Sequence, residues 1–208
     1  MNKNNAKKLA KTLVKKEKFP SCLFAEFMKN GWNNLLDEVY EQTAIYILEN
    51  QGISKTKWEH LKHILPSIAF YKVLVKKEGS SEKALDFFGK NCFTKVIKIA
   101  KIIPLLLKIP GLYQKTPGIM KKLIVSKFGE NAGFEFTEKE CKNGFAIDMT
   151  KCPYFETCKK YDCPELTQFF CKSDDYCYGN MHPKLIWGRT KTLGTGGDVC
   201  DFRLEIRE

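Results

Sequence analysis

Seven of the nine cysteines lie in the last third of the chain, where their thiols could serve as nucleophiles or as metal ligands. From position 152 to position 177 the neighbouring cysteines are separated by five, four, seven and five residues, whereas zinc knuckles use two-residue gaps. Two interpretations stay open. The thiols are mostly buried apolar groups with one or two in a site, or they hold a metal through Cys152, Cys158, Cys163, Cys171 or Cys177. The first interpretation needs no cofactor and assigns no metal ligand.

Carboxylates accompany two of these thiols. Cys171 and Asp174 are three residues apart in a segment that we expect to be helical, so one helical face can present both groups. Cys200 and Asp201 are adjacent in an expected strand and therefore point to opposite faces of it. These four residues are the candidate catalytic groups. Cys200 is favoured over Cys171 as the nucleophile, because a thiol beside a glycine-rich loop can be exposed, whereas a thiol in the middle of a helix tends to be buried. The alternative for Asp174 is an ordinary helix end or a solvated turn.

The glycine-rich segment 194–198 precedes Cys200 directly. Backbone amides at Gly196 and Gly197 could receive an anion or a developing oxyanion, although an ordinary hairpin turn has the same composition. Arg189 is one of three arginines and could hold a substrate carboxylate by two parallel hydrogen bonds, or could pair with Asp201 as a structural element.

His182 is the single histidine of the last third and a candidate general base near pH 7, unless it is simply an exposed loop residue.

Helical periodicity runs through the first 130 residues. Apolar residues recur at three- and four-residue spacing over 32–48, 55–77 and 82–99, and a further helix is expected over 118–128. Ser54 is a cap for the second of these helices, and Pro66 should kink or split it. The first 18 residues form a basic tail or helix.

After Gly129 the texture changes to short strands, over 133–136 and 144–149, and then to two short helices, over 154–160 and 164–178. Residues 185–193 and 199–206 should pair as a hairpin around the glycine-rich segment. The sequence thus predicts an α+β protein with a mainly helical N-terminal region, 1–130, and a Cys-rich region, 131–208, that holds a small antiparallel sheet with two short helices.

The amino-acid composition argues against several classes of protein. With 43% apolar and 28% charged residues, the chain is globular, and its most apolar window, 96–113, is too interrupted by Lys and Pro to span a membrane. No secretion signal is recognised, and the odd number of cysteines suggests reduced thiols, so a cytoplasmic location is expected. The net charge of +11 comes from residues 1–130, which carry lysine but no arginine. A solvated helical surface explains this better than nucleic-acid binding, which usually uses arginine.

Five blocks of sequence, taken in order, resemble the L-2-amino-thiazoline-4-carboxylic acid hydrolase family. They are Asp148-Met149-Thr150-Lys151-Cys152-Pro153-Tyr154, Pro164-Glu165-Leu166, Cys171-Lys172-Ser173-Asp174-Asp175, Arg189-Thr190-Lys191-Thr192-Leu193 and Gly196-Gly197-Asp198-Val199-Cys200-Asp201-Phe202-Arg203. They cover about 60 residues, and Cys158, Cys163 and Cys177 have no place in the pattern.

The resemblance implies a hydrolase of bacterial-type metabolism that opens a cyclic amidine or thiazoline-like metabolite, with a small molecule as its partner. Water would add at the carbon between ring nitrogen and sulfur and leave a carbamoyl-cysteine. Its substrate-binding residues would be Arg189, Thr190, Gly196, Gly197 and His182. Two alternatives remain: a cysteine-rich sensor that binds a metal or ligand without turnover, and an accessory protein whose basic helices dock an anionic surface. The sequence says nothing of the oligomeric state.

Overall fold

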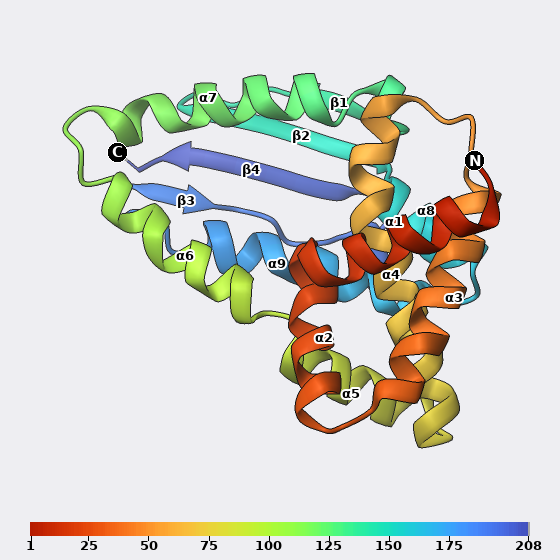
Figure 1. Ribbon diagram of the computed structural model, residues 1–208. Coiled ribbons are helices and arrows are strands. Elements are labelled where there is room, and N and C mark those ends of the chain that lie inside the picture. Colours follow the sequence, from red (N-terminus) through yellow and green to blue (C-terminus); the bar gives the residue numbers. More distant parts are fainter. Residues whose placement is uncertain (208) are drawn as a thin grey trace. The chain divides into compact units, whose positions relative to one another are not determined.

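The structure is a computed structural model that describes residues 1–207 (Figure 1). Its contacts form two compact units, Met1–Lys95 and Val96–Glu208. The boundary lies in the first turn of α6 (Thr94–Leu106), so α6 belongs almost entirely to the second unit. The change from helical to strand patterns near residue 130 lies inside that unit, between α7 and β1. No helix within residues 1–207 combines the length and apolar character that crossing a bilayer requires.

The first unit is helical. It contains α1 (Lys3–Lys16), α2 (Lys18–Lys29), α3 (Asn33–Glu49), α4 (Lys55–Glu78) and α5 (Ser81–Asn91). Ser54 caps α4 as expected, because its hydroxyl accepts the Lys57 N–H at 3.1 Å. Gly79 ends the helix in a left-handed conformation, with a φ of 63°. The helix continues through Pro66 instead of splitting there, and we attribute this to the dense packing of the buried helix around it.

Aromatic side chains fill the centre of the first unit. Phe27 packs edge-on against Phe70, with 4.9 Å between ring centroids, and against Trp32, with 5.2 Å. The helix expected over 82–99 is instead two helices, because α5 ends at Asn91 and the chain turns at Cys92 and Phe93, which are both buried. A period of 3.6 residues continues across this turn, where Cys92 and Phe93 are not residue types that signal a helix end.

The second unit is a sheet with helices. Its elements are α6, α7 (Leu112–Lys127), η1 (Glu130–Ala132), β1 (Glu135–Lys139), β2 (Gly144–Lys151), α8 (Pro153–Lys160), η2 (Pro164–Leu166), α9 (Thr167–Tyr178), β3 (Leu185–Trp187), η3 (Leu193–Thr195) and β4 (Cys200–Ile206). The strands form an antiparallel sheet in the order β1-β2-β4-β3. The predicted α+β class is confirmed. The hairpin is shorter than expected, since only Leu185–Trp187 pairs with β4 and residues 188–199 form a loop.

The two faces of this sheet differ in polarity. Alternate residues of β2 and β4, including Ile147, Met149, Phe202 and Leu204, point to an apolar face, which α6 and α7 cover. The opposite face is polar, and there Arg203 donates to the carboxylate of Asp148 at 2.5 Å. Because the period along a strand is two, neighbouring residues of β4 serve different faces.

Candidate active site

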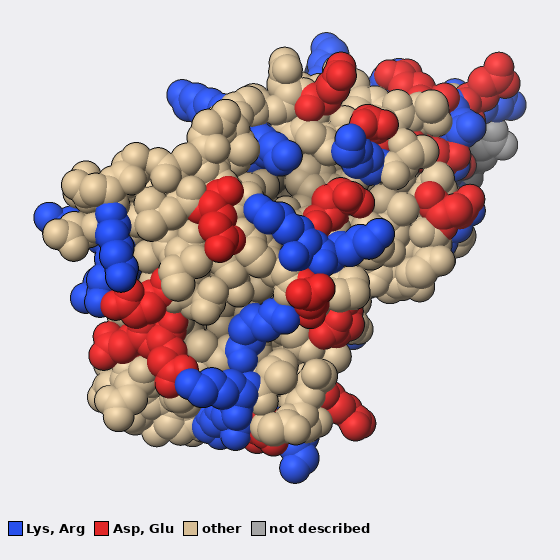
Figure 2. All heavy atoms as spheres, turned by 90° about the vertical axis from the view of Figure 1, so that its right-hand side faces the viewer, with Lys and Arg blue, Asp and Glu red and all other residues tan. Residues whose placement is uncertain are grey.

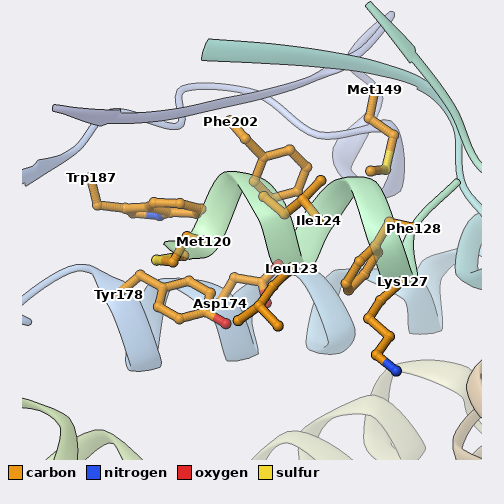
Figure 3. A pocket seen from close by; sticks show the side chains of 10 residues that line it. All are labelled: Met120, Leu123, Ile124, Lys127, Phe128, Met149, Asp174, Tyr178, Trp187 and Phe202. Carbon is orange, nitrogen blue, oxygen red and sulfur yellow. The ribbon is translucent and has the colours of Figure 1, made fainter. Parts of the chain in front are cut away.

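A cavity of about 270 Å³ lies in the second unit between α7, α9 and the apolar face of the sheet (Figure 3). Its lining is mostly apolar or aromatic: Met120, Leu123, Ile124, Lys127, Phe128, Met149, Asp174, Tyr178, Trp187 and Phe202. The carboxylate of Asp174 lies among these side chains, whereas the amine of Lys127 points away from the rings (Figure 3). Asp174 is the sole carboxylate of the ten residues drawn. A concave apolar site with few polar groups is typical of small-molecule binding.

Regular secondary structure accounts for this arrangement. Asp174 and Tyr178 are four residues apart on α9 and therefore share a helical face. On the sheet, Phe202 lies two residues after Cys200 on the same face of β4, and Met149 is the direct partner of Cys200 on β2. The cavity and the candidate thiol thus occupy the same face of the sheet.

Arg189 holds Asp174 in place. Its guanidinium, with only 4% of the side chain exposed, donates to Asp174 at 3.2 Å, to Asp175 at 2.5 Å and to the carbonyl of Cys171 at 2.8 Å. The indole N–H of Trp187 donates to Asp175 at 3.0 Å. From the sequence, Arg189 is a candidate clamp for a substrate carboxylate or a partner of Asp201. The structure instead pairs it with two carboxylates of α9, which leaves this cluster one net negative charge.

The thiols of Cys152, Cys171 and Cys200 lie near one another beside the cavity. Cys200 is 3% exposed, packs with Cys152 in an apolar cluster and accepts the Leu193 N–H at 3.2 Å. Burial raises the pKa of Cys200 to about 11 and that of Cys152 to about 12, and the nearby charge of Asp174 contributes to the former.

Burial also raises the pKa of Cys171, although hydrogen bonds from Thr192 and Gly194 act in the opposite direction. At neutral pH these groups are thiols rather than thiolates. The structure therefore brings Cys171, Cys200 and Asp174 together, but it gives the two sulfurs little nucleophilic character.

Asp201 lies on the other face of β4, away from the cavity lining. Its carboxylate accepts the hydroxyl and the N–H of Thr190, at 2.5 and 3.0 Å, and the N–H of Lys191, at 2.8 Å. Burial raises the pKa of Asp201, but these hydrogen bonds outweigh it and lower the pKa below its usual value. Asp201 and Thr190 thus fix the path of the loop after Arg189.

The glycine-rich loop is closed by its own hydrogen bonds. The Gly197 amide donates to the Thr192 carbonyl at 2.8 Å, and the Gly196 amide donates to the Leu193 carbonyl at 3.3 Å. Gly196 has a φ of 89°, which a side chain would disfavour. Both amides considered for an oxyanion are therefore engaged inside the loop.

The remaining candidates lie outside the cavity lining. His182 stacks on Tyr113, with 4.5 Å between ring centroids, and its Nδ1 accepts the Lys184 N–H at 3.1 Å. Cys158 and Cys163 are fully buried, and the Cys163 thiol bonds to the Cys158 carbonyl at 3.4 Å. Across residues 1–207, no group of three or more His, Cys, Asp and Glu side chains is arranged to hold a metal ion.

Most residues of the cavity lining are not among the site residues predicted from the sequence. Its largest part comes from α7, where the sequence predicts only a helix over 118–128, and from Tyr178, Trp187 and Phe202. Two signals were available: the four-residue spacing of Asp174 and Tyr178 on α9, and the alternation that places Phe202 on the same face as Cys200.

Fold and site together define a small α+β protein in which two helices and a sheet enclose an apolar cavity with a carboxylate inside it. Residues 58–204 match the family described as L-2-amino-thiazoline-4-carboxylic acid hydrolase. This match spans well over half of the chain, and the protein belongs to that family. It begins in α4 and so includes part of the first unit, which contributes none of the five blocks quoted above. No curated protein and no solved structure matches the chain.

Proposed function

We propose that the protein is a hydrolase that opens a cyclic amidine of the 2-amino-thiazoline-4-carboxylate type in the cavity between α7, α9 and the sheet. Membership of the family supports the hydrolytic reaction. The cavity is proposed as the site because the carboxylate of Asp174 lies in its mostly apolar lining. An amidine is a base that is readily protonated, and a carboxylate can accept hydrogen bonds from its N–H groups.

Asp174 would serve as the acid-base group. Hydrogen bonds from the substrate amidine to its carboxylate hold the ring and favour the protonated, more electrophilic form. Water then attacks the carbon between nitrogen and sulfur, the carbon–sulfur bond breaks, and the sulfur leaves as a thiol. One proton of the water passes through Asp174 to the departing sulfur, and the other returns to solvent in exchange for the proton that the amidine took up. The product keeps both nitrogens on the attacked carbon as a carbamoyl group.

The surrounding residues support this assignment. Arg189 is a positioning residue, because it holds the Asp174 carboxylate by an ion pair and is not among the cavity-lining residues. Tyr178 keeps its hydroxyl protonated, since burial raises its pKa above the usual value. Trp187 and Phe202 supply flat apolar surfaces for a ring.

A thiolate of Cys200 or Cys171 is the other route to ring opening. We favour water as the nucleophile, because Cys200 is almost fully buried and its pKa is about 11. Asp201 would then contribute by fixing the loop that carries Arg189, and not by transferring protons.

The test compares Asp174→Asn with Asp175→Asn. Both carboxylates bind Arg189, but Asp175 is not among the cavity-lining residues. We expect Asp174→Asn to lower the rate of thiazoline opening by roughly 100-fold or more, the usual contribution of a general acid-base group. Asp175→Asn should retain most of the activity. Chromatography with mass detection of the carbamoyl-cysteine product avoids interference from the protein's own thiols.

A wild-type protein that does not open the thiazoline would contradict the proposed substrate. Full activity in Asp174→Asn would contradict the proposed site while leaving the reaction in place.

A further inference from the structure

The end of α6 and the turn after it expose four large aliphatic side chains. Ile102, Leu105, Leu106 and Ile109 have exposed fractions of 52%, 61%, 53% and 55%. Single exposed apolar residues are ordinary, but four within eight positions form a patch, and such patches mark interaction sites. We call these four residues the α6 patch.

Packing within the second unit does not account for the α6 patch. On its buried side α6 supplies Val96, which is 1% exposed, and Ile103. Directly after the helix, Leu107 is 6% exposed and packs with Ile103 in the core against the sheet. The helix is therefore apolar on its buried side and, in its last turns, on its outer side as well. A helix that is apolar all round needs a second apolar environment.

The charged residues around the α6 patch indicate which apolar environment it contacts. The chain contains no Asp or Glu between Asp86 and Glu130, whereas exposed lysines flank the α6 patch at Lys98, Lys101 and Lys108. Elsewhere the surface is mixed, and Figure 2 shows a face on which basic and acidic side chains lie beside one another. Exposed aliphatic residues with lysines and no acids are typical of segments that lie in the plane of an anionic bilayer surface.

A second copy of the chain fits the patch less well. A symmetric contact through the same surface would bring Lys101 and Lys108 of one copy close to the same lysines of the other. Without acids in this segment, like charges would oppose that contact. An anionic lipid surface supplies both the apolar layer and the opposite charge.

We propose that the α6 patch docks the protein onto membranes rich in anionic lipid. Ile102, Leu105, Leu106 and Ile109 enter the boundary between headgroups and acyl chains, and the flanking lysines bind lipid phosphates with their aliphatic stems against the apolar layer. The helix lies on the membrane and does not cross it. This inference is independent of the proposed hydrolysis.

Flotation of the full chain with vesicles tests the proposal. We expect binding to vesicles of phosphatidylcholine mixed with phosphatidylglycerol, weak binding to phosphatidylcholine alone, and release as salt rises. The double variant Leu105→Gln/Leu106→Gln should bind roughly tenfold more weakly or worse, because two aliphatic side chains no longer enter the apolar layer. The matched control is Met28→Gln/Ile45→Gln, whose sites are 49% and 44% exposed in the first unit.

A second double variant, in the lysines, tests the proposal even if Leu105→Gln/Leu106→Gln does not fold. Lys101→Ala/Lys108→Ala keeps the α6 patch and should weaken binding by about fivefold for each lysine removed. Circular dichroism melting curves check that each variant is folded.

Three results would overturn the proposal: wild-type protein that stays unbound with phosphatidylglycerol present, equal losses in the patch and control variants, or lysine removal without effect on binding. Analytical ultracentrifugation adds a fourth. If the wild-type protein does not bind vesicles but forms a dimer, and Leu105→Gln/Leu106→Gln dissociates that dimer, the α6 patch binds a second copy of the chain.

Discussion

Burial decides which side chains near the cavity are able to react. Cys200 and Asp174 both adjoin the cavity, yet Cys200 is 3% exposed, whereas the Asp174 side chain is 35% exposed. Burial raises the pKa of Cys200 to about 11, so this thiol keeps its proton at neutral pH, whereas Asp174 forms an ion pair with the Arg189 guanidinium. Cys200, the nucleophile favoured from the sequence, is therefore less accessible in the fold than Asp174.

Replacement of Cys200 by alanine separates the two routes to ring opening. We expect Cys200→Ala to keep thiazoline-opening activity within about tenfold of wild type, because water is the proposed nucleophile. Loss of a covalent nucleophile would cost far more, up to a factor of roughly a million in a serine protease. The measurement is the rate at saturating substrate, with Cys22→Ala as a control at a buried thiol in the first unit. A folded Cys200→Ala protein without activity would restore the thiol as the nucleophile.

Asp201 should make stability depend on pH. Its folded pKa is lowered, because its hydrogen bonds outweigh the effect of burial, so its stabilising effect is fully present above the unfolded pKa of about 4. That effect is lost as pH falls through the folded pKa. We therefore expect Asp201→Asn to lower the free energy of unfolding at neutral pH, and the difference from wild type to shrink below about pH 4.

Urea unfolding followed by circular dichroism at several pH values measures this difference. Asp198→Asn is the control, because the Asp198 side chain is 77% exposed and water screens its ion pair with Lys191. A difference that stays constant down to acid pH would show that the Asp201 carboxylate is not the titrating group.

At the scale of elements, the loop between β3 and β4 owes its position to close packing on α9. A Cβ atom at Gly194 would lie 2.7 Å from Thr167 Cγ2 and 3.0 Å from the Cys171 sulfur. The same loop carries Arg189, which reaches α9 through three hydrogen bonds. The loop packs closely on α9 because Gly194 has no side chain, and Arg189 binds the loop to α9 by hydrogen bonds.

Gly194→Ala should therefore destabilise the protein by about 1–3 kcal/mol, the usual cost of overpacking. The matched substitution Gly118→Ala lies within α7, where a Cβ would meet nothing within 4 Å, and should stabilise the protein by about 0.5–1 kcal/mol through helix propensity. Urea titrations of both variants give the two free energies. Equal effects would mean that Gly194 does not determine the packing of the loop on α9.

At the scale of the whole molecule, the sequence predicted the architecture better than the site. Periodicity and the Ser54 cap located α4 almost to the residue, and strand signals after Gly129 predicted the sheet. Local patterns predict elements because caps and periods act within a few residues. The split of the helix expected over 82–99 depends on burial of Cys92 and Phe93, which no local pattern reports.

The site was harder to predict because its parts are distant in sequence. The five blocks of the family resemblance contain Asp174 and Phe202, but not the residues of α7 that form much of the cavity wall. A fixed pattern also cannot show that Arg189 binds the protein's own carboxylates, or that the glycine-rich loop uses its amides internally. Those facts depend on which side chains tertiary structure brings into contact.

The composition of the cavity wall offers a practical route to altered selectivity. Met120, Leu123, Ile124 and Lys127 fall within eight consecutive positions of α7, whereas Asp174 and the sheet residues come from other segments. A combinatorial library encoded by one short mutagenic oligonucleotide would reshape this side of the cavity and leave the carboxylate, its arginine and the sheet unchanged. Screening such a library with thiazolines of increasing ring substitution would show how the side chains of α7 determine which substrates the cavity accepts.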